Sequence, residues 1–428
     1  MKPVPGVVSF VLVGRWLVMD YSTLRSRYGY DCDVRGTYAH LPCQSFWTWL
    51  TGKDLRRGPP RKPKETLLSE WQMWCQLAWS WSITLIAAVG GALVYNDPDI
   101  ALWVKVPVVI VSWVLVVNRT RGLLHSFHYT NHGAGIASMD RARWMGKYFM
   151  SIPILHTPWD NYHSIHAKDH HSTVYLCTNK DPDEVFMTEH GFRMGMSERE
   201  FWVRLVVAPF FPRNIWNHIK FRLEQNFIKT AWSERLPRIG FWCLFFAATA
   251  YFNIWEEVAI FYLFPLLILT QFSSWIQHTT EHLWFAKKPE DVSTFVYYAS
   301  LTWGRFLGRP HPGKGRGVGH ALKLAKWWTL AVVVDLPIRL FSFMQDLPSH
   351  DFHHRSPKVN FWSIARERAA NEGLPSKYGP MTDSWGLWES FRILRDHLCR
   401  GVNDPFGVYE WERAQRRQSA EATAVAAE

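Results

Sequence analysis

The sequence predicts an all-α integral membrane protein, in which two transmembrane helical hairpins (four spans) carry a cytosolic helical cap. Three observations predict it. Long apolar runs carry almost no charge. The 428 residues include 25 tryptophans, a residue enriched at membrane–water interfaces because its ring is apolar and its N–H is polar. Histidines cluster beside the apolar runs. Abundant apolar residues exclude an intrinsically disordered chain.

Residues 76–95 and 101–118 form the first predicted hairpin. The first run is uncharged and about 20 residues long, enough to cross about 30 Å of hydrocarbon. An Asn-Asp-Pro-Asp sequence follows at residues 96–99, which is typical of a turn. The second run contains one charge, Lys105, close to its start. We therefore expect two spans joined by a very short outer loop.

The second predicted hairpin is formed by residues 239–253 and 258–276. Its first arm is short, and Glu256 and Glu257 mark the turn. We expect a kink at Pro265, since proline removes a backbone hydrogen bond from the helix. A buried hairpin of a soluble protein remains an alternative for this pair.

The distribution of basic residues predicts the orientation. Lysines and arginines lie before the first and third spans and after the second and fourth, whereas the loop at 96–100 has none. The positive-inside rule then places both termini and the active site in the cytosol. The net charge of +11 fits basic faces beside anionic lipid, and no nucleic-acid-binding motif accompanies it. The predicted divisions are an N-terminal cytosolic segment (1–70), a membrane domain (71–357) and a C-terminal cytosolic segment with a disordered tail (358–428).

Four histidine clusters carry the chemistry. Histidines four residues apart share one face of a helix, and imidazoles suit iron, zinc or copper. The six cysteines form no CxxC pair, which argues against an iron–sulfur or structural zinc site. The clusters contain few carboxylates, which argues against a soluble carboxylate-bridged di-iron bundle. Their members are His125, His128 and His132; His163, His166, His170 and His171; His278 and His282; and His350, His353 and His354.

In order and spacing, the hairpins and clusters resemble the integral-membrane fatty acid desaturase/hydroxylase superfamily over roughly residues 71–357. The sequence His132-Gly133 is similar to the end of that family's first histidine box. The stretch Thr-Asn-Lys-Asp-Pro-Asp at 178–183 is similar to the segment after the second box. The pair Glu281-His282 is similar to the Glu-His that follows the fourth span in alkane-hydroxylase-like members.

The resemblance implies a non-haem centre of two iron ions, with no catalytic residue separate from the metal ligands. His278 rivals His282 for the ninth ligand position, and His125 and His163 are expected to have supporting roles. Acidic residues near the boxes are candidates to orient the imidazoles through the nitrogen that faces away from the metal: Asp169, Asp181, Asp183, Glu281, Asp346 and Asp351. The implied ligands are His128, His132, His166, His170, His171, His282, His350, His353 and His354.

The resemblance further implies an oxidase that uses O2 as co-substrate to desaturate an acyl chain or a similar lipophilic molecule. Electrons would come from a separate ferredoxin, flavoprotein reductase or cytochrome b5, because the sequence His-Pro-Gly-Lys at 311–314 lacks the His-Pro-Gly-Gly of a fused cytochrome b5 domain. Three residues separate His166 from His170, where many acyl desaturases have two. A hydroxylase or monooxygenase is therefore the alternative, and a polytopic metal-binding transporter or sensor is a remote one.

Overall fold

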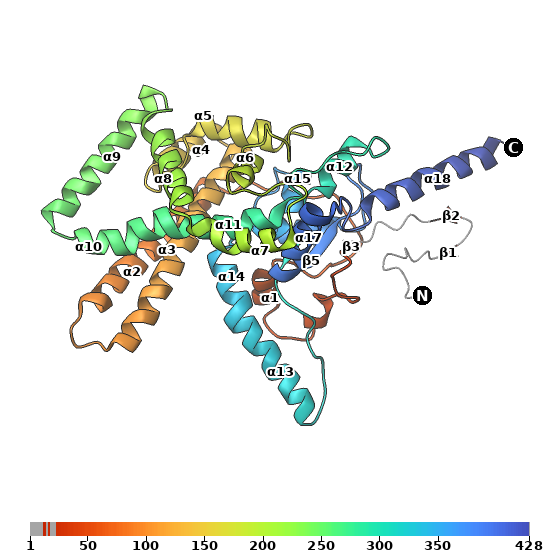
Figure 1. Cartoon of the computed structure of the whole chain (residues 1–428), viewed down its shortest axis with the longest axis horizontal. Helices are drawn as coiled ribbons and strands as arrows, with labels where there is room; N and C mark the ends of the chain where they lie inside the picture. Colours follow the sequence, from red (N-terminus) through yellow and green to blue (C-terminus); the bar gives the residue numbers. More distant parts are fainter. Residues whose placement is uncertain (1–11, 14–15, 18–22, 428) are drawn as a thin grey trace.

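The computed structural model describes residues 12–13, 16–17 and 23–427, and these residues are mostly helical (Figure 1). The predicted all-α class is confirmed at this level. One small sheet was not predicted. Its strands β3 (Leu24–Arg25), β5 (Thr382–Trp385) and β4 (Gly304–Phe306) pair in parallel in the order β3-β5-β4. Strands of two to four residues are too short to show the alternation by which a strand is detected in sequence.

The first predicted hairpin is formed by α2 (Glu70–Asn96) and α3 (Leu102–Asn131), which project together from the body (Figure 1). Ser69 begins α2 with a capping box that includes Gln72. The helices approach closely at Gly91, where a Cβ atom would lie 2.7 Å from Ser112 Oγ and 2.6 Å from the ring of Phe261. Gly91 thus permits α2, α3 and the segment containing Phe261 to pack together.

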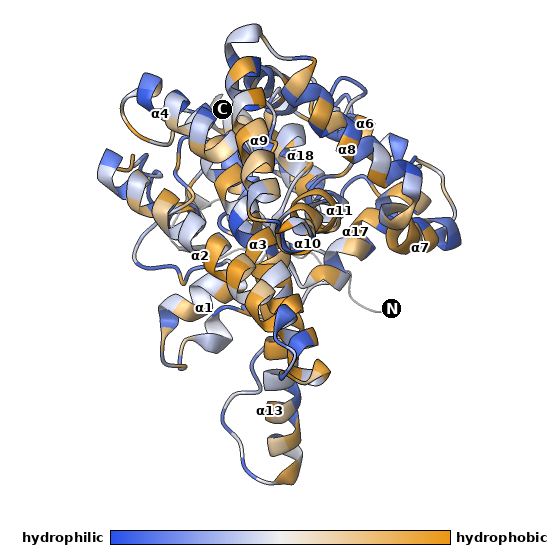
Figure 2. Ribbon diagram, turned by 90° about the vertical axis from the view of Figure 1, so that its left-hand side faces the viewer, coloured by the Kyte–Doolittle hydropathy of each residue, from blue (hydrophilic) through white to orange (hydrophobic). Residues whose placement is uncertain are grey.

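Three helical segments are long and apolar enough to cross a membrane: α2, α3 and the continuous segment Trp255–Glu281. The third consists of α10 (Trp255–Val258), π-helical turns η5 (Ala259–Leu263) and η6 (Pro265–Leu269), and α11 (Thr270–Glu281). The departure from α geometry adjoins Pro265, where the sequence predicts a kink. Figure 2 shows that hydrophobic residues lie along much of α3 and α11.

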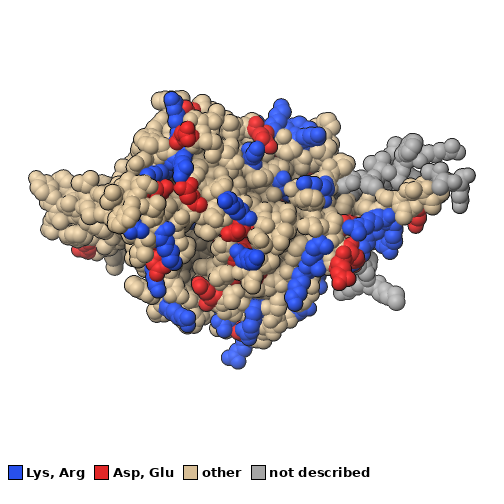
Figure 3. All heavy atoms as spheres, turned by 90° about the horizontal axis from the view of Figure 1, so that it is seen from above, with Lys and Arg blue, Asp and Glu red and all other residues tan. Residues whose placement is uncertain are grey.

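The remaining predicted span, residues 239–253, lies largely within α9 (Trp232–Tyr251). This helix is not among the three apolar segments found in the described residues. Its first two turns carry Glu234, Arg235 and Arg238, and the fully buried Arg238 pairs with Glu234 at 3.3 Å. The face seen in Figure 3 shows few charged side chains at the end where α9 and α10 lie. Three of the four predicted spans coincide with these apolar segments, and the fourth, within α9, stays a prediction.

The rest of the chain surrounds the ends of α3 and α11. This part of the chain has an apolar core that includes Trp275, Trp284, Trp303 and Leu394. This core holds the histidine-bearing segments against the apolar helices. Its other helical elements are η1 (Gly36–Tyr38), α1 (Gln44–Thr51), α4 (Met139–Met145), η2 (Gly146–Ser151), α5 (Trp159–Tyr162), η3 (His163–His170), α6 (Pro182–Glu189), α7 (Glu198–Val207), η4 (Ala208–Phe210), α8 (Pro212–Phe227), α12 (Thr294–Ser300), α13 (Val318–Leu330), η7 (Ala331–Asp335), α14 (Leu336–Phe341), η8 (Leu347–Ser349), α15 (His350–Arg355), α16 (Ile364–Asn371), α17 (Leu387–Arg400) and α18 (Val408–Ala427); β1 (Leu12–Val13) and β2 (Trp16–Leu17) form an antiparallel pair.

Candidate metal centre

Four segments bring the nine histidines of the predicted ligand set together. They are the end of α3, the π-helix η3 with the residue after it, the end of α11, and α15. The imidazoles form two groups, in each of which one nitrogen per residue lies within 4.8 Å of all the others. That they bind metal stays a prediction. The first group is His128, His132, His166, His171 and His353, and the second is His170, His282, His350 and His354.

In the first group, four Nε2 atoms form a closed ring. Their separations are 2.8 Å (His128–His353), 3.1 Å (His128–His166), 3.1 Å (His166–His171) and 3.2 Å (His171–His353). Nitrogens about 3.1 Å apart around a square would each lie about 2.2 Å from its centre, close to a metal–imidazole bond of about 2.0–2.1 Å. The buried Nε2 of His132, the fifth member, has no hydrogen-bond partner among the described residues. The ring therefore fits a cation.

The second group is smaller and fully buried. His350 Nε2 lies 3.3 Å from His282 Nε2 and 3.1 Å from His354 Nε2. The ring of His354 stacks on that of His171 in the first group, with centroids 4.3 Å apart. The two groups are thus adjacent, as two neighbouring ions require.

The π-helical geometry of η3 divides the second histidine box between the groups. The His171 N–H donates to the His166 carbonyl at 3.0 Å, an i to i+5 bond. His166 and His171 consequently face the same way, and their Nε2 atoms lie 3.1 Å apart. His170 faces the other group. The ring of His170 still stacks on that of His166, with centroids 5.2 Å apart, so the three imidazoles remain neighbours although they belong to different groups.

The acidic candidates have different partners. Asp181 Oδ1 lies 3.0 Å from His170 Nδ1, and an Asp183 oxygen lies 3.3 Å from the same nitrogen. Asp351 instead accepts from Arg368 at 2.7 Å. Tyr298, which sequence reasoning missed, places its hydroxyl 2.9 Å from His354 Nδ1. A tyrosine in the short helix α12 (Thr294–Ser300) gives no signal of this contact in the sequence.

Two further acidic candidates contact histidines outside the two groups, and Glu281 also reaches the second group, with an oxygen 3.7 Å from His350 Nε2. Glu281 Oε1 lies 3.0 Å from His278 Nδ1. Asp346 accepts from the Tyr129 hydroxyl at 2.8 Å and lies 3.6 Å from His125 Nδ1. These carboxylates are close enough to hold the ends of α3 and α11 in place beside the nine imidazoles.

The remaining predicted histidines lie beside the groups. The side chain of His278 is 18% exposed and turns toward Glu281 and Asp183. His163 Nδ1 lies 2.8 Å from Asn131 Oδ1. Of the two rivals for the ninth position, the structure brings His282, and not His278, into the second group.

Burial keeps most of the imidazoles neutral, which is the form that binds metals. It lowers the pKa of His132 to about 3 and the pKa values of His166, His171 and His353 well below their usual range. Burial also lowers the pKa of His170, but the nearby carboxylates outweigh this effect and raise that pKa to about 9. Positive charge is thus favoured at this imidazole.

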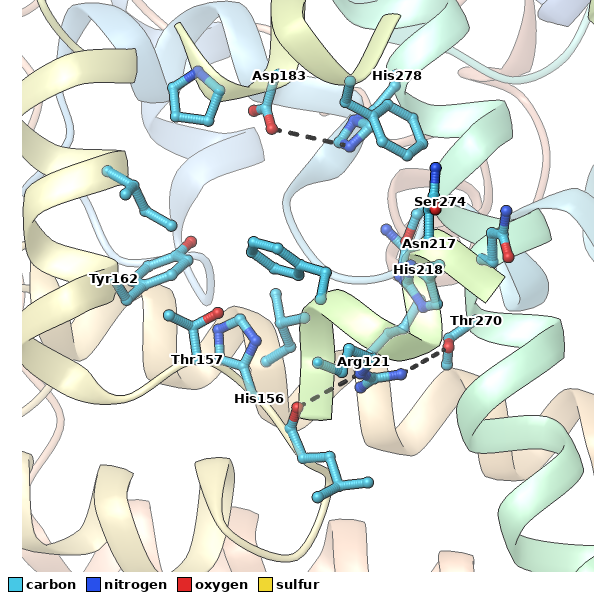
Figure 4. Close-up of a pocket in the computed structure, with 18 of the residues that line it drawn as sticks. Arg121, His156, Thr157, Tyr162, Asp183, Asn217, His218, Thr270, Ser274 and His278 are labelled. Atoms are coloured by element: carbon cyan, nitrogen blue, oxygen red, sulfur yellow. Dashed lines mark hydrogen bonds and ion pairs between the residues drawn. The ribbon is translucent and has the colours of Figure 1, made fainter. Parts of the chain in front are cut away.

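A cavity of about 570 Å³ lies beside the groups (Figure 4). Tyr162, Asp183 and His278 line it, and they also line a smaller cavity of about 190 Å³ that reaches His128, His166, His170 and His350. The larger cavity therefore adjoins the metal-facing imidazoles. Its volume suits a small lipophilic molecule, since ligand pockets of about 300–1,000 Å³ are usual.

In comparisons with known proteins, no family model and no curated sequence matches this chain.

Proposed function

We propose that this protein is a membrane non-haem di-iron oxidase that uses O2 and electrons from a separate donor to desaturate an acyl chain or similar lipophilic substrate. The observation that carries the proposal is the pair of adjacent imidazole groups, five and four, beside one cavity. Imidazoles without thiolates suit iron of this kind. Bound iron would supply the O2 chemistry needed to attack an unactivated C–H bond.

The chain's own residues have three roles in this proposal. The nine histidines hold the two ions. Asp181 and Tyr298 fix the orientation of His170 and His354 through their outward nitrogens. The buried cavity next to the imidazoles excludes bulk water and positions the substrate. The three apolar helices support a membrane location, while the fourth span, the cytosolic orientation and the donor (ferredoxin, flavoprotein reductase or cytochrome b5) remain parts of the proposal.

Metal analysis of the purified, detergent-solubilised protein tests the proposal. We expect about two irons per chain, and a loss of iron in His353→Ala, which removes one corner from the ring of the first group. His282→Ala is expected to lose iron from the second group. The matched controls are His278→Ala and His163→Gln, which alter neighbouring histidines outside both groups and are expected to keep the iron.

Zinc in place of iron, or iron that both His353→Ala and His282→Ala retain, would refute the oxidase and favour a metal-binding transporter or sensor. If His278→Ala loses iron and His282→Ala keeps it, then His278, and not His282, is the ninth ligand.

Hydroxylation is the second candidate, favoured by the three residues between His166 and His170. The same ligands serve both reactions, and the position of the substrate relative to the ions selects the product. Incubation of the reduced protein with a panel of acyl chains under 18O2 separates them: an 18O-labelled alcohol marks hydroxylation, and an unlabelled alkene marks desaturation.

A further inference from the structure

The cavity of Figure 4 has polar groups that the protein leaves without partners. Gln271, on α11, is 1% exposed, and neither its Nε2 nor its Oε1 has a hydrogen-bond partner among the described residues. His156, His190 and His218 each have a buried Nε2 in the same condition, and all four residues line the cavity. Buried polar atoms normally find partners, because leaving them unpaired costs free energy. A ligand with polar atoms of its own is therefore expected here.

The hydrogen bond of His190 defines what its free nitrogen can do. Its Nδ1 lies 2.8 Å from the carbonyl oxygen of Phe186, which only accepts, so Nδ1 carries the proton. Burial lowers the pKa of His190 to about 4, so the ring is neutral near pH 7. Nε2 then has a lone pair and is an acceptor. It requires a donor from the ligand, which a carboxylate lacks.

The buried Arg222 has few N–H groups left for a ligand. Its guanidinium donates to the carbonyl of Ile154 at 2.7 Å and to Thr270 Oγ1 at 3.1 Å, and it also contacts the Leu266 carbonyl. Most of its N–H groups are therefore in use within the protein.

Gln271 and His190 lie in the part of the cavity remote from the metal-facing imidazoles. Neither residue lines the smaller cavity that reaches those imidazoles. Along α11 and its C-cap, Gln271 precedes His282 by eleven positions, about 16 Å of helix at 1.5 Å per residue. Figure 4 shows Tyr162, Thr157 and His156 on one side of the cavity and His218, Thr270 and Ser274 on the other.

We propose that this cavity binds a lipophilic molecule that carries a neutral hydroxyl group at the end remote from the metal centre, and that Gln271 and His190 bind this hydroxyl. The hydroxyl donates to His190 Nε2 and accepts from the Gln271 amide, so one unpartnered atom of each residue gains a partner. That this ligand is the substrate rests on the proposed function, whereas its binding does not.

The test is competition binding to the full-length protein in nanodiscs, with tritiated 1-decanol as the probe and unlabelled 1-decanol, decane and decanoate as competitors. We expect 1-decanol to compete at a concentration at least about 10-fold lower than decane, the difference that one well-placed hydrogen bond supplies. Gln271→Met, which keeps the length of the side chain, and His190→Phe are each expected to reduce this ratio to within about 3-fold. Val185→Ala alters an apolar part of the lining and is expected to preserve it.

Three results would overturn the proposal: decane or decanoate competing as well as 1-decanol, no saturable binding of 1-decanol, or the wild-type ratio in both Gln271→Met and His190→Phe. Iron content measured on the same preparations separates the two proposals. Two irons with no preference for the alcohol defeat this inference alone, and the alcohol preference without iron defeats the proposed function alone.

Discussion

Replacement of Arg368 by Met is expected to destabilise the protein by about 3–5 kcal/mol, the usual cost of removing one partner from a buried ion pair. The Arg368 side chain is 1% exposed and donates to Asp351 at 2.7 Å and to Asp383 at 2.7 Å. Lys53 still pairs with Asp383 in the variant. Asp351, whose side chain is fully buried, loses its ion-pair partner. Because Asp351 follows His350 in α15, its unpaired charge strains the third histidine box, which consists of His350, His353 and His354.

Thermal and denaturant unfolding in detergent measures this cost, and iron content measures its effect on the box. We expect a lower transition temperature and a fractional loss of iron in Arg368→Met. The matched control is Arg413→Ala, which breaks the exposed pair with Asp291 and is expected to leave stability close to that of wild type. Equal stability of Arg368→Met and Arg413→Ala would show that the buried network does not hold the box in place.

Three further predictions concern single positions. Gly52→Ala is expected to lower stability by at least about 2 kcal/mol, because its φ is +83° and a Cβ would lie 2.1 Å from Pro348 beside the third box. Gly58 has a φ of +75° and open space around it. Gly58→Ala therefore controls for the backbone conformation alone in the same unfolding assay. Burial raises the pKa of Glu389 from 4.5 to about 7, so the stability that its protonated form contributes is present below pH 4.5 and lost as the pH rises through 7. Between pH 5 and pH 8, unfolding curves should show wild type losing up to about 3 kcal/mol of stability relative to Glu389→Gln. The same change in both proteins would refute this. Tyr298→Phe removes the hydroxyl bonded to an imidazole of the second group and should weaken iron binding about 10- to 100-fold in a chelator competition, whereas unchanged affinity would show that this hydroxyl does not support a ligand.

The sequence by itself determined the local features. Uncharged apolar runs indicate α2, α3 and the segment Trp255–Glu281, since a helix of that composition is stable in hydrocarbon without outside partners. The resemblance in the order and spacing of the histidine clusters implied all nine residues that the structure brings together. The prediction at 239–253 located a helix, but the charged residues at the start of α9 keep it outside the three apolar segments.

Only the tertiary structure decided how these parts combine. Which histidine joins which group depends on contacts between residues far apart in the chain, such as His128 with His353, and on the π-helical turn that brings His171 beside His166. The partner of Asp351 proved to be Arg368, because α16 packs against α15 and brings a guanidinium closer to it than any imidazole. Gln271 and His190 carry no recognisable motif, since an unpaired polar atom is defined by its surroundings. Spacing along the chain specifies the ligands available, and packing between distant segments specifies how they are arranged.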